Sequence, residues 1–263
     1  MPFAQNGGVR IYHKVEGKDG LPPIVLLNSI GTEMAMWDRA IPYLLDHFLV
    51  VRIDTRGHGA SDAPVGDYSM PMLAGDVLAV MDAAGIDKAA IAGVSLGGMI
   101  AMELALAAPE RVNGLALICT TATVHQQMWA DRIAKVRAAG MASIVDGVMP
   151  RFLDGAFTEN FPEYAETIRR AFLSTSPIGY SGCGAAIRDM ALLDRLGEIT
   201  APSLVVIGTL DQATPLAGNG ELMLTGIAGS EMAEVPGAHI SPIGAPAEVA
   251  AALTGHFRKD HTI

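Results

Sequence analysis

Short, mainly apolar stretches recur along the chain. In residues 9–15 apolar and polar side chains alternate, which is typical of a strand with one face exposed. The later stretches are almost wholly apolar, as expected for strands covered on both faces. These predicted strands lie at residues 24–27, 48–53, 89–92, 115–118 and 203–207, with a last edge strand at 231–235.

Between these stretches, apolar residues recur at the spacing of a helix. Residues 68–84 show this period, and Gly85 stands where the C-terminal cap of that helix is expected. Further helices are predicted at residues 37–45, 99–107, 185–196, 216–225 and 246–257. Because strands and helices alternate, the sequence predicts an α/β protein, with a mainly parallel twisted sheet flanked by helices.

The alternation is interrupted in the middle of the chain. Helical segments follow one another there without an intervening apolar strand, at residues 128–139, 142–149 and 164–174. We interpret this part as a helical insertion that forms a cap over the active end of the sheet. The expected division is a core of residues 1–120 and 185–263 and a cap of residues 121–184.

Composition and charge narrow the class of protein. The chain has 263 residues, of which 50% are hydrophobic and 17% charged, so one large globular domain with an insertion is expected. The formal net charge of −10 argues against nucleic acid as a partner, since phosphate binding needs a basic face. For the same reason, an acidic substrate would need a local cationic pocket.

Nothing in the sequence predicts a membrane span, a secretory signal or a metal site. No apolar run approaches the roughly 20 residues that cross a bilayer. The N-terminus lacks the basic start and apolar core of a signal peptide. The only cysteines, Cys119 and Cys183, are not spaced as metal ligands. We therefore expect a cytoplasmic protein with reduced thiols and no membrane partner.

A Gly-x-Ser-x-Gly motif at residues 93–97 follows one predicted strand and precedes a predicted helix. This order is typical of a nucleophile elbow, a sharp turn that presents a serine. The strained turn and the close passage of strand and helix favour residues without a Cβ, here Gly93, Gly97 and Gly98. Ser95 is therefore the candidate nucleophile, with the positive end of the following helix directed at its target.

A serine nucleophile needs a base within hydrogen-bond reach and a third group that orients the base. In enzymes with such an elbow, the acid and then the histidine follow the serine, each after a strand. Asp211 and His239 each follow a predicted strand beyond Ser95. His58 is the main rival base because it also lies in a loop after a strand, but it precedes Ser95. We predict His239 as the base and Asp211 as its orienting acid.

Acyl transfer also requires two N–H donors for the oxyanion of the tetrahedral intermediate. One is the backbone N–H of the residue after the nucleophile, Leu96. The other is expected in the loop after the strand at residues 24–27, where Ile30 is our choice. Asn28 in the same loop is a further polar candidate, or it only orders the loop.

Three motifs together resemble those of the α/β-hydrolases, and they lie at residues 27–32, 54–61 and 93–98. Further segments narrow the resemblance to the 3-oxoadipate enol-lactonases of aromatic catabolism, at residues 129–132, 179–190, 201–202 and 208–215. The resemblance covers nearly the whole chain and implies the α/β-hydrolase fold. The chain departs from that family at residues 240–244 and near 151–154, where an expected aromatic pair is absent. These departures concern the identity of the lactone rather than catalysis.

The resemblance implies a small lactone substrate with a free carboxylate, and no metal or organic cofactor. In a chain of net charge −10, a specific cation must hold that carboxylate. An arginine can do so with two charged hydrogen bonds. Arg132, three residues after Trp129 on a predicted helix, is the candidate. The alternative is that Trp129 belongs to the core of the cap and Arg132 to a solvated face.

These inferences predict a serine hydrolase that opens 3-oxoadipate enol-lactone through an acyl-enzyme on Ser95. One alternative is a general carboxylesterase or another cap-bearing hydrolase. A different alternative is a ligand-binding protein that kept the fold and lost turnover. The intact set of Ser95, Asp211 and His239 argues against this last alternative.

Overall fold

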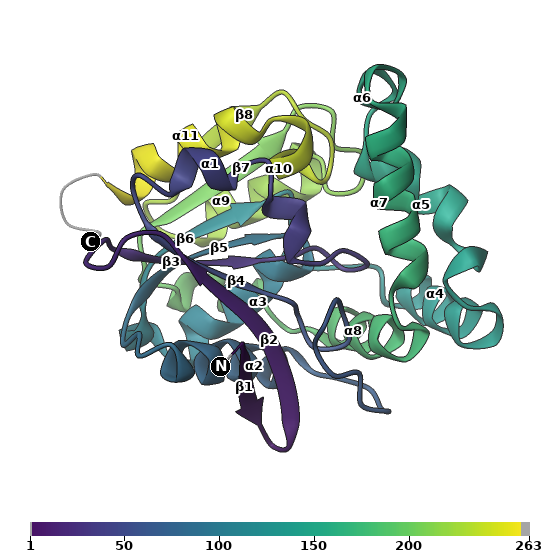
Figure 1. Ribbon diagram of the computed structural model, residues 1–263, viewed down its shortest axis with the longest axis horizontal. Helices are drawn as coiled ribbons and strands as arrows, with labels where there is room; N and C mark the ends of the chain where they lie inside the picture. The colour runs from purple at the N-terminus through teal and green to yellow at the C-terminus, as the bar shows by residue number, and fades with distance from the viewer. Residues whose placement is uncertain (1, 259–263) are drawn as a thin grey trace.

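One β-sheet forms the centre of the computed structural model, which describes residues 2–258 (Figure 1). Across the sheet the strands have the order β1-β2-β4-β3-β5-β6-β7-β8. Their bounds are Phe3–Asn6 (β1), Val9–Glu16 (β2), Pro23–Leu27 (β3), Leu49–Ile53 (β4), Ala89–Val94 (β5), Val112–Ile118 (β6), Ser203–Gly208 (β7) and Glu231–Val235 (β8).

The sheet is mainly parallel. β2 pairs antiparallel with both β1 and β4, whereas every neighbouring pair from β4 to β8 is parallel. Every residue of β5 and β7 is buried, because helices cover both faces of the central strands. The predicted fold class is thereby confirmed. Since the carboxyl ends of parallel strands meet at one edge, the loops after β3, β5, β6, β7 and β8 open at the same end of the sheet.

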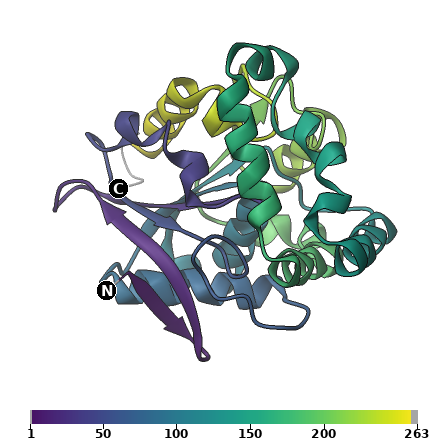
Figure 2. The ribbon, with the colours of Figure 1, turned by 45° about the vertical axis from the view of Figure 1, so that its right-hand side comes forward.

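Helices cover the two faces of the sheet. On one face lie α2 (Met70–Ala83) and α3 (Leu96–Ala107), and on the other α1 (Ile41–Leu44) and α11 (Pro246–Phe257) (Figures 1 and 2). Two shorter helices, α9 (Glu221–Gly226) and α10 (Ser241–Gly244), lie in the C-terminal part of the chain. No helix within residues 2–258 is long and apolar enough to span a membrane.

Between β6 and β7 the chain forms helices that gather at one end of the sheet, on the right in Figure 1. They are α4 (Gln126–Ala139), α5 (Val145–Phe152), α6 (Gly155–Asn160), α7 (Pro162–Ser174) and α8 (Pro177–Asp189). Of these helices, α4 and α8 pack against one another along their length. The succession of helices without a strand agrees with the pattern of the sequence in this part of the chain.

The helix expected at residues 185–196 is wrong in its bounds. It begins at Pro177, where the side chain of Ser176 caps the first turn by accepting a hydrogen bond from the Gly179 N–H at 3.2 Å. It ends at Asp189, and a separate 3₁₀ helix follows at Leu193–Glu198. The boundary that we expect between cap and core, after residue 184, therefore falls inside α8.

Three other local predictions also differ from the structure. The helix expected at residues 37–45 is a 3₁₀ helix at Met34–Trp37 followed by the short α1. The helix expected at 216–225 is interrupted at Gly218, whose φ of 74° is incompatible with a continuous α-helix, and α9 begins only at Glu221. Strand β1 was not predicted, because its four residues are too few for a clear alternation of apolar and polar side chains.

Candidate active site

Ser95 lies in the sharp turn between β5 and α3. Its φ of 54° and ψ of −114° place a non-glycine residue in a strained region of the backbone. A Cβ on Gly93 would overlap the backbone of Gly97, and one on Gly97 would come within 2.7 Å of the Leu27 carbonyl oxygen. The glycines of the motif are thus required by the close passage of strand and helix.

The strained turn is held by hydrogen bonds to the neighbouring strand and the loop after it. The Ser95 N–H donates to the Ile118 carbonyl at 3.0 Å, and the Thr120 hydroxyl donates to the Ser95 carbonyl at 2.6 Å. The Ser95 side chain makes no capping hydrogen bond with α3. Its hydroxyl is therefore available for chemistry rather than for stabilising the helix.

Asp211 and His239 lie together in the loops after β7 and β8. The two carboxylate oxygens of Asp211 are 3.1 and 3.0 Å from His239 Nδ1, and both side chains are buried. Burial alone would raise the pKa of Asp211, but hydrogen bonds from His239, the Thr214 hydroxyl and the Ala213 N–H outweigh it. They hold the pKa of Asp211 at about 2. Asp211 is thus ionised at neutral pH, and its contact with Nδ1 fixes the orientation of the His239 imidazole.

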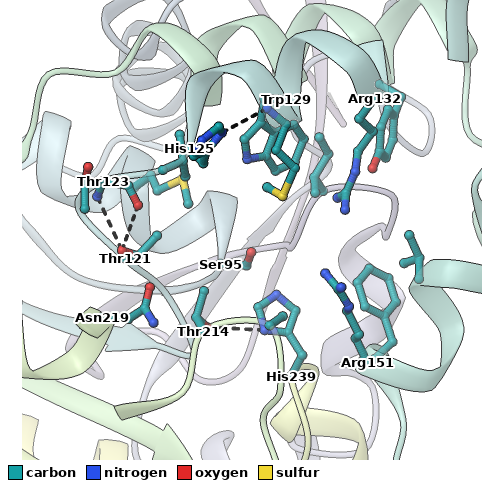
Figure 3. A pocket seen from close by; sticks show the side chains of 18 residues that line it. Ser95, Thr121, Thr123, His125, Trp129, Arg132, Arg151, Thr214, Asn219 and His239 are labelled. Carbon is teal, nitrogen blue, oxygen red and sulfur yellow. Dashed lines mark hydrogen bonds between the residues drawn. The ribbon is translucent and has the colours of Figure 1, made fainter. Parts of the chain in front are cut away.

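His239 is also held by contacts with α5 (Val145–Phe152). The last turn of α5 reaches its loop, because the His239 N–H donates to the Arg151 carbonyl at 3.3 Å and the Ile240 N–H to the Phe152 carbonyl at 3.2 Å. The Phe152 ring stacks on the imidazole with centroids 5.9 Å apart. Ser95 and His239 line the same cavity (Figure 3). Among the described residues no hydrogen bond joins their side chains, an arrangement common in enzymes without bound substrate.

The two N–H groups that are predicted to stabilise the oxyanion have no acceptor among the described residues of the protein. Within the part of the chain that the structure describes, neither the Leu96 N–H nor the Ile30 N–H donates to another protein group. Leu96 is the first residue of α3, and Ile30 lies in the loop after β3 and lines the cavity beside Ser95. Both can therefore donate to an oxygen bound next to Ser95.

The loop that carries Ile30 is ordered by buried side chains. Asn28 donates to the Thr32 carbonyl at 2.7 Å and accepts from the Thr55 N–H at 3.0 Å. Asn28 thus orders the loop, the alternative left open by the sequence. His58, the rival base, accepts from the Gly31 N–H at 2.9 Å through Nε2. The Nε2 atom of His58 is therefore engaged by the Gly31 loop, and the imidazole does not line the cavity.

The buried imidazole of His58 leads to a prediction on pH and stability. Burial lowers the pKa of His58 from 6.5 to about 4 in the folded protein. The folded state therefore binds fewer protons than the unfolded chain between these values, and stability falls as the pH falls through this window. The expected loss is about 3 kcal/mol between pH 6.5 and 4.

Urea unfolding at a series of pH values measures this loss. In His58→Gln, whose side-chain oxygen can accept from the Gly31 N–H, the free energy of unfolding should depend much less on pH. Some dependence remains, because burial also lowers the pKa of His13. An unchanged pH dependence in His58→Gln would remove His58 from this account.

A cavity of about 300 Å³ opens above Ser95, between the sheet and the helices α4 and α5. Trp129 and Arg132, both from α4, lie in its wall (Figure 3). The Arg132 guanidinium carbon lies 4.8 Å from the centre of the Trp129 ring, a cation–π contact. Trp129 is buried, and Arg132 is half-buried and directed into the cavity rather than to a solvated face.

The sequence signature of the α/β-hydrolase fold matches residues 22–246. The chain belongs to the α/β-hydrolase family. Within this family it is 33% identical over 239 residues to 3-oxoadipate enol-lactonase 2 of Acinetobacter baylyi, which covers 90% of this chain and 89% of that protein.

Solved structures of other α/β-hydrolases superpose on nearly the whole chain. The enol-lactonase from Burkholderia xenovorans does so with a TM-score of 0.90 at 36% identity, covering 97% of each chain. A thermophilic esterase from Thermogutta terrifontis, solved with malate bound, gives a TM-score of 0.90 at 27% identity, covering 99% of this chain and 97% of that one.

The site of this α/β-hydrolase also contains two polar residues, Thr214 and Arg151, that were not predicted from the sequence. Thr214 donates to Asp211 Oδ2 at 2.8 Å, and a threonine three residues after the acid is the local signal that could have indicated it. Arg151 lines the cavity from the end of α5 (Figure 3). No sequence spacing relates Arg151 to Ser95. Among residues 2–258 no cluster of His, Cys, Asp or Glu side chains is arranged to hold a metal ion.

Proposed function

We propose that this α/β-hydrolase opens 3-oxoadipate enol-lactone to 3-oxoadipate in the catabolism of aromatic compounds. The observation that carries the proposal is one small cavity in which Ser95 and His239 share the walls with Arg132 (Figure 3). A nucleophile, a base and a cation in such a cavity suit a lactone that bears a carboxylate. Similarity to an enol-lactonase over 90% of the chain supports the same substrate.

In the proposed mechanism the Ser95 oxygen attacks the ring carbonyl carbon while His239 Nε2 accepts the hydroxyl proton. Asp211 orients the imidazole and stabilises the imidazolium that forms. The N–H groups of Leu96 and Ile30 stabilise the oxyanion, and losing one such donor typically costs about 3–4 kcal/mol.

Ring opening and hydrolysis complete the cycle. The ring C–O bond breaks, and the leaving enolate takes the proton held by His239 and rearranges from enol to ketone, so its departure costs little. Water then gives a proton to His239 and attacks the acyl carbon. The ester bond to Ser95 breaks, the second carboxylate is released, and Ser95 regains its proton from His239.

We assign the free carboxylate of the lactone to Arg132. The stacking of its guanidinium on Trp129 keeps the planar group in the cavity wall. Charged hydrogen bonds to a carboxylate contribute roughly 1.5–3 kcal/mol each.

We also propose that the insertion expected at residues 121–184, extended to the end of α8 at Asp189, acts as the cap that closes the cavity, with residues 1–120 and the part that follows α8 as the catalytic core. The core supplies Ser95 and His239, and helices of the cap supply Trp129 and Arg132. In this division, the cap determines the substrate and the core performs the chemistry.

A general carboxylesterase is the second candidate function. The apolar side chains of Met99, Met128 and Val148 also line the cavity and suit a neutral acyl chain. Similarity to the thermophilic esterase is in line with this alternative. Faster hydrolysis of several neutral esters than of the lactone would favour it.

Turnover of 3-oxoadipate enol-lactone, generated in situ, tests the proposal. We expect a kcat/KM above about 10⁴ M⁻¹s⁻¹, in the ordinary range of enzymes. Slow turnover by a protein that still reacts with a fluorophosphonate at Ser95 would keep the hydrolase and exclude this lactone. No labelling at Ser95 would favour the ligand-binding protein instead.

A further inference from the structure

Arg151 places a second guanidinium in the cavity. In Figure 3 the side chains of Arg151 and Arg132 enter from opposite rims and point toward one another, on the side away from Thr121 and Asn219. The two come from different helices, α5 and α4, so nothing local in the sequence brings them together. The cavity thus receives two positively charged side chains, one from each of these helices.

These two charges lack a carboxylate partner among residues 2–258. Most other arginines of the described chain are paired with Asp or Glu. Tyr180 is a polar neighbour of Arg132, but burial raises the pKa of its hydroxyl, which stays neutral at pH 7. In a chain of net charge −10, a site with two uncompensated cations is well suited to an anion.

The backbone of Arg151 is fixed relative to the catalytic base. Its carbonyl accepts from the His239 N–H at 3.3 Å, and the next residue, Phe152, stacks on the imidazole with centroids 5.9 Å apart. The backbone at this position is therefore held beside the catalytic base, and the exposed Arg151 side chain reaches the cavity from it. Two guanidinium groups that face one another repel, and a carboxylate between them removes the repulsion.

We propose that Arg132 and Arg151 form an arginine clamp that holds one carboxylate between them while an ester carbonyl of the same molecule lies at Ser95. The chain then also hydrolyses acyclic half-esters of short dicarboxylic acids, besides opening a lactone. The inference rests on the proposed acyl-enzyme chemistry of Ser95. It adds Arg151 as a residue that determines specificity and a wider class of substrate.

The chemistry of this activity balances without a further reactant. The ester C–O bond breaks as the Ser95 oxygen bonds to the acyl carbon, and the leaving alcohol takes the proton held by His239. Water then cleaves the acyl-enzyme and releases a dicarboxylate. A cavity of about 300 Å³ limits the acid to a short chain.

A pair of substrates of equal size isolates the clamp. 4-Nitrophenyl hydrogen adipate carries a carboxylate at the far end, and 4-nitrophenyl adipamate carries a neutral amide there. We expect a kcat/KM about 10- to 100-fold higher for the charged ester. Arg151→Met and Arg132→Met should each remove most of this preference, because the rate on the charged ester falls far more than the rate on the amide ester.

The matched control is Arg170→Met, which removes an exposed, ion-paired arginine of the cap outside the cavity. It should keep the full preference. A ratio of charged to neutral rates that is unchanged in Arg151→Met would overturn the clamp. So would a ratio near one in the unmodified protein, even while lactone opening and labelling of Ser95 persist.

A binding experiment separates the clamp from the proposed chemistry. In Ser95→Ala protein, calorimetry with monomethyl adipate should give a Kd about 10- to 100-fold lower than in Ser95→Ala, Arg151→Met protein. Equal Kd values would overturn the clamp. Retained tight binding together with no hydrolysis of either ester by the unmodified protein would support the clamp but reject the esterase chemistry and the half-ester activity.

Discussion

Ser95→Ala is expected to lower kcat for the lactone by about 10⁴- to 10⁶-fold, because no other group in the cavity can replace the serine oxygen as nucleophile. Folding should be unaffected. Serine and alanine both carry a Cβ, so the strain at a φ of 54° is the same in both proteins. The Ser95 hydroxyl makes no capping hydrogen bond with α3 whose loss would destabilise the helix.

Three measurements on the same preparation check this prediction. The kcat should fall, the fluorophosphonate label should be absent, and the Tm should remain that of the unmodified protein. If Ser95→Ala folded normally and kept a rate within tenfold of the original, Ser95 would have no role as nucleophile. If the Tm fell strongly as well, the hydroxyl would have a structural role that its surroundings do not indicate.

The sheet and the elbow could be predicted because their signals are local. Uniformly apolar runs as short as residues 24–27, bounded by turn residues, favour buried strands, and a glycine pair around Ser95 reflects steric limits within a few residues. The order of strands then places Asp211 and His239 at the end of the sheet where Ser95 lies. The chain order of the three residues was enough to bring them to one site.

The arrangement of the helices between β6 and β7 was harder to predict, because their contacts join segments that are far apart in the sequence. Arg151 enters the cavity only because the end of α5 packs on the loop of His239. The hydrogen bond from the Gly31 N–H to His58 likewise joins two loops that are separate in the sequence, and the hydrophobic periodicity of the chain cannot indicate that they meet. The start of α8 at Pro177 was missed because three glycines in that helix hide its period. The proposed determinants of specificity thus lie in the part of the chain whose structure the sequence predicts least.

Asp211→Asn is expected to lower kcat by about 10⁴-fold with little loss of stability. Asp211 Oδ1 accepts from the N–H groups of Ala213 and Thr214 at 2.7 and 3.2 Å, and the asparagine carbonyl can keep these bonds. Its NH₂ group would then occupy the place of Oδ2 and face His239 Nδ1. Because the NH₂ group donates, it favours the tautomer in which Nδ1 is an acceptor and the ring proton lies on Nε2.

An imidazole protonated at Nε2 cannot accept the proton of Ser95, which is why a change of one atom removes most of the activity. The charge matters as well. The pKa of Asp211 is held at about 2, so at neutral pH its carboxylate stabilises the imidazolium that forms during the reaction. The neutral amide gives no such stabilisation.

Thr214→Val is the matched control for this effect. It removes the 2.8 Å hydrogen bond from the Thr214 hydroxyl to Oδ2 but keeps the carboxylate and both backbone donors. One such bond is worth roughly 1–1.5 kcal/mol, so kcat should fall only about tenfold. If Asp211→Asn lowered kcat no more than Thr214→Val, the carboxylate would merely brace the loop, and the tautomer of His239 would be set by another group.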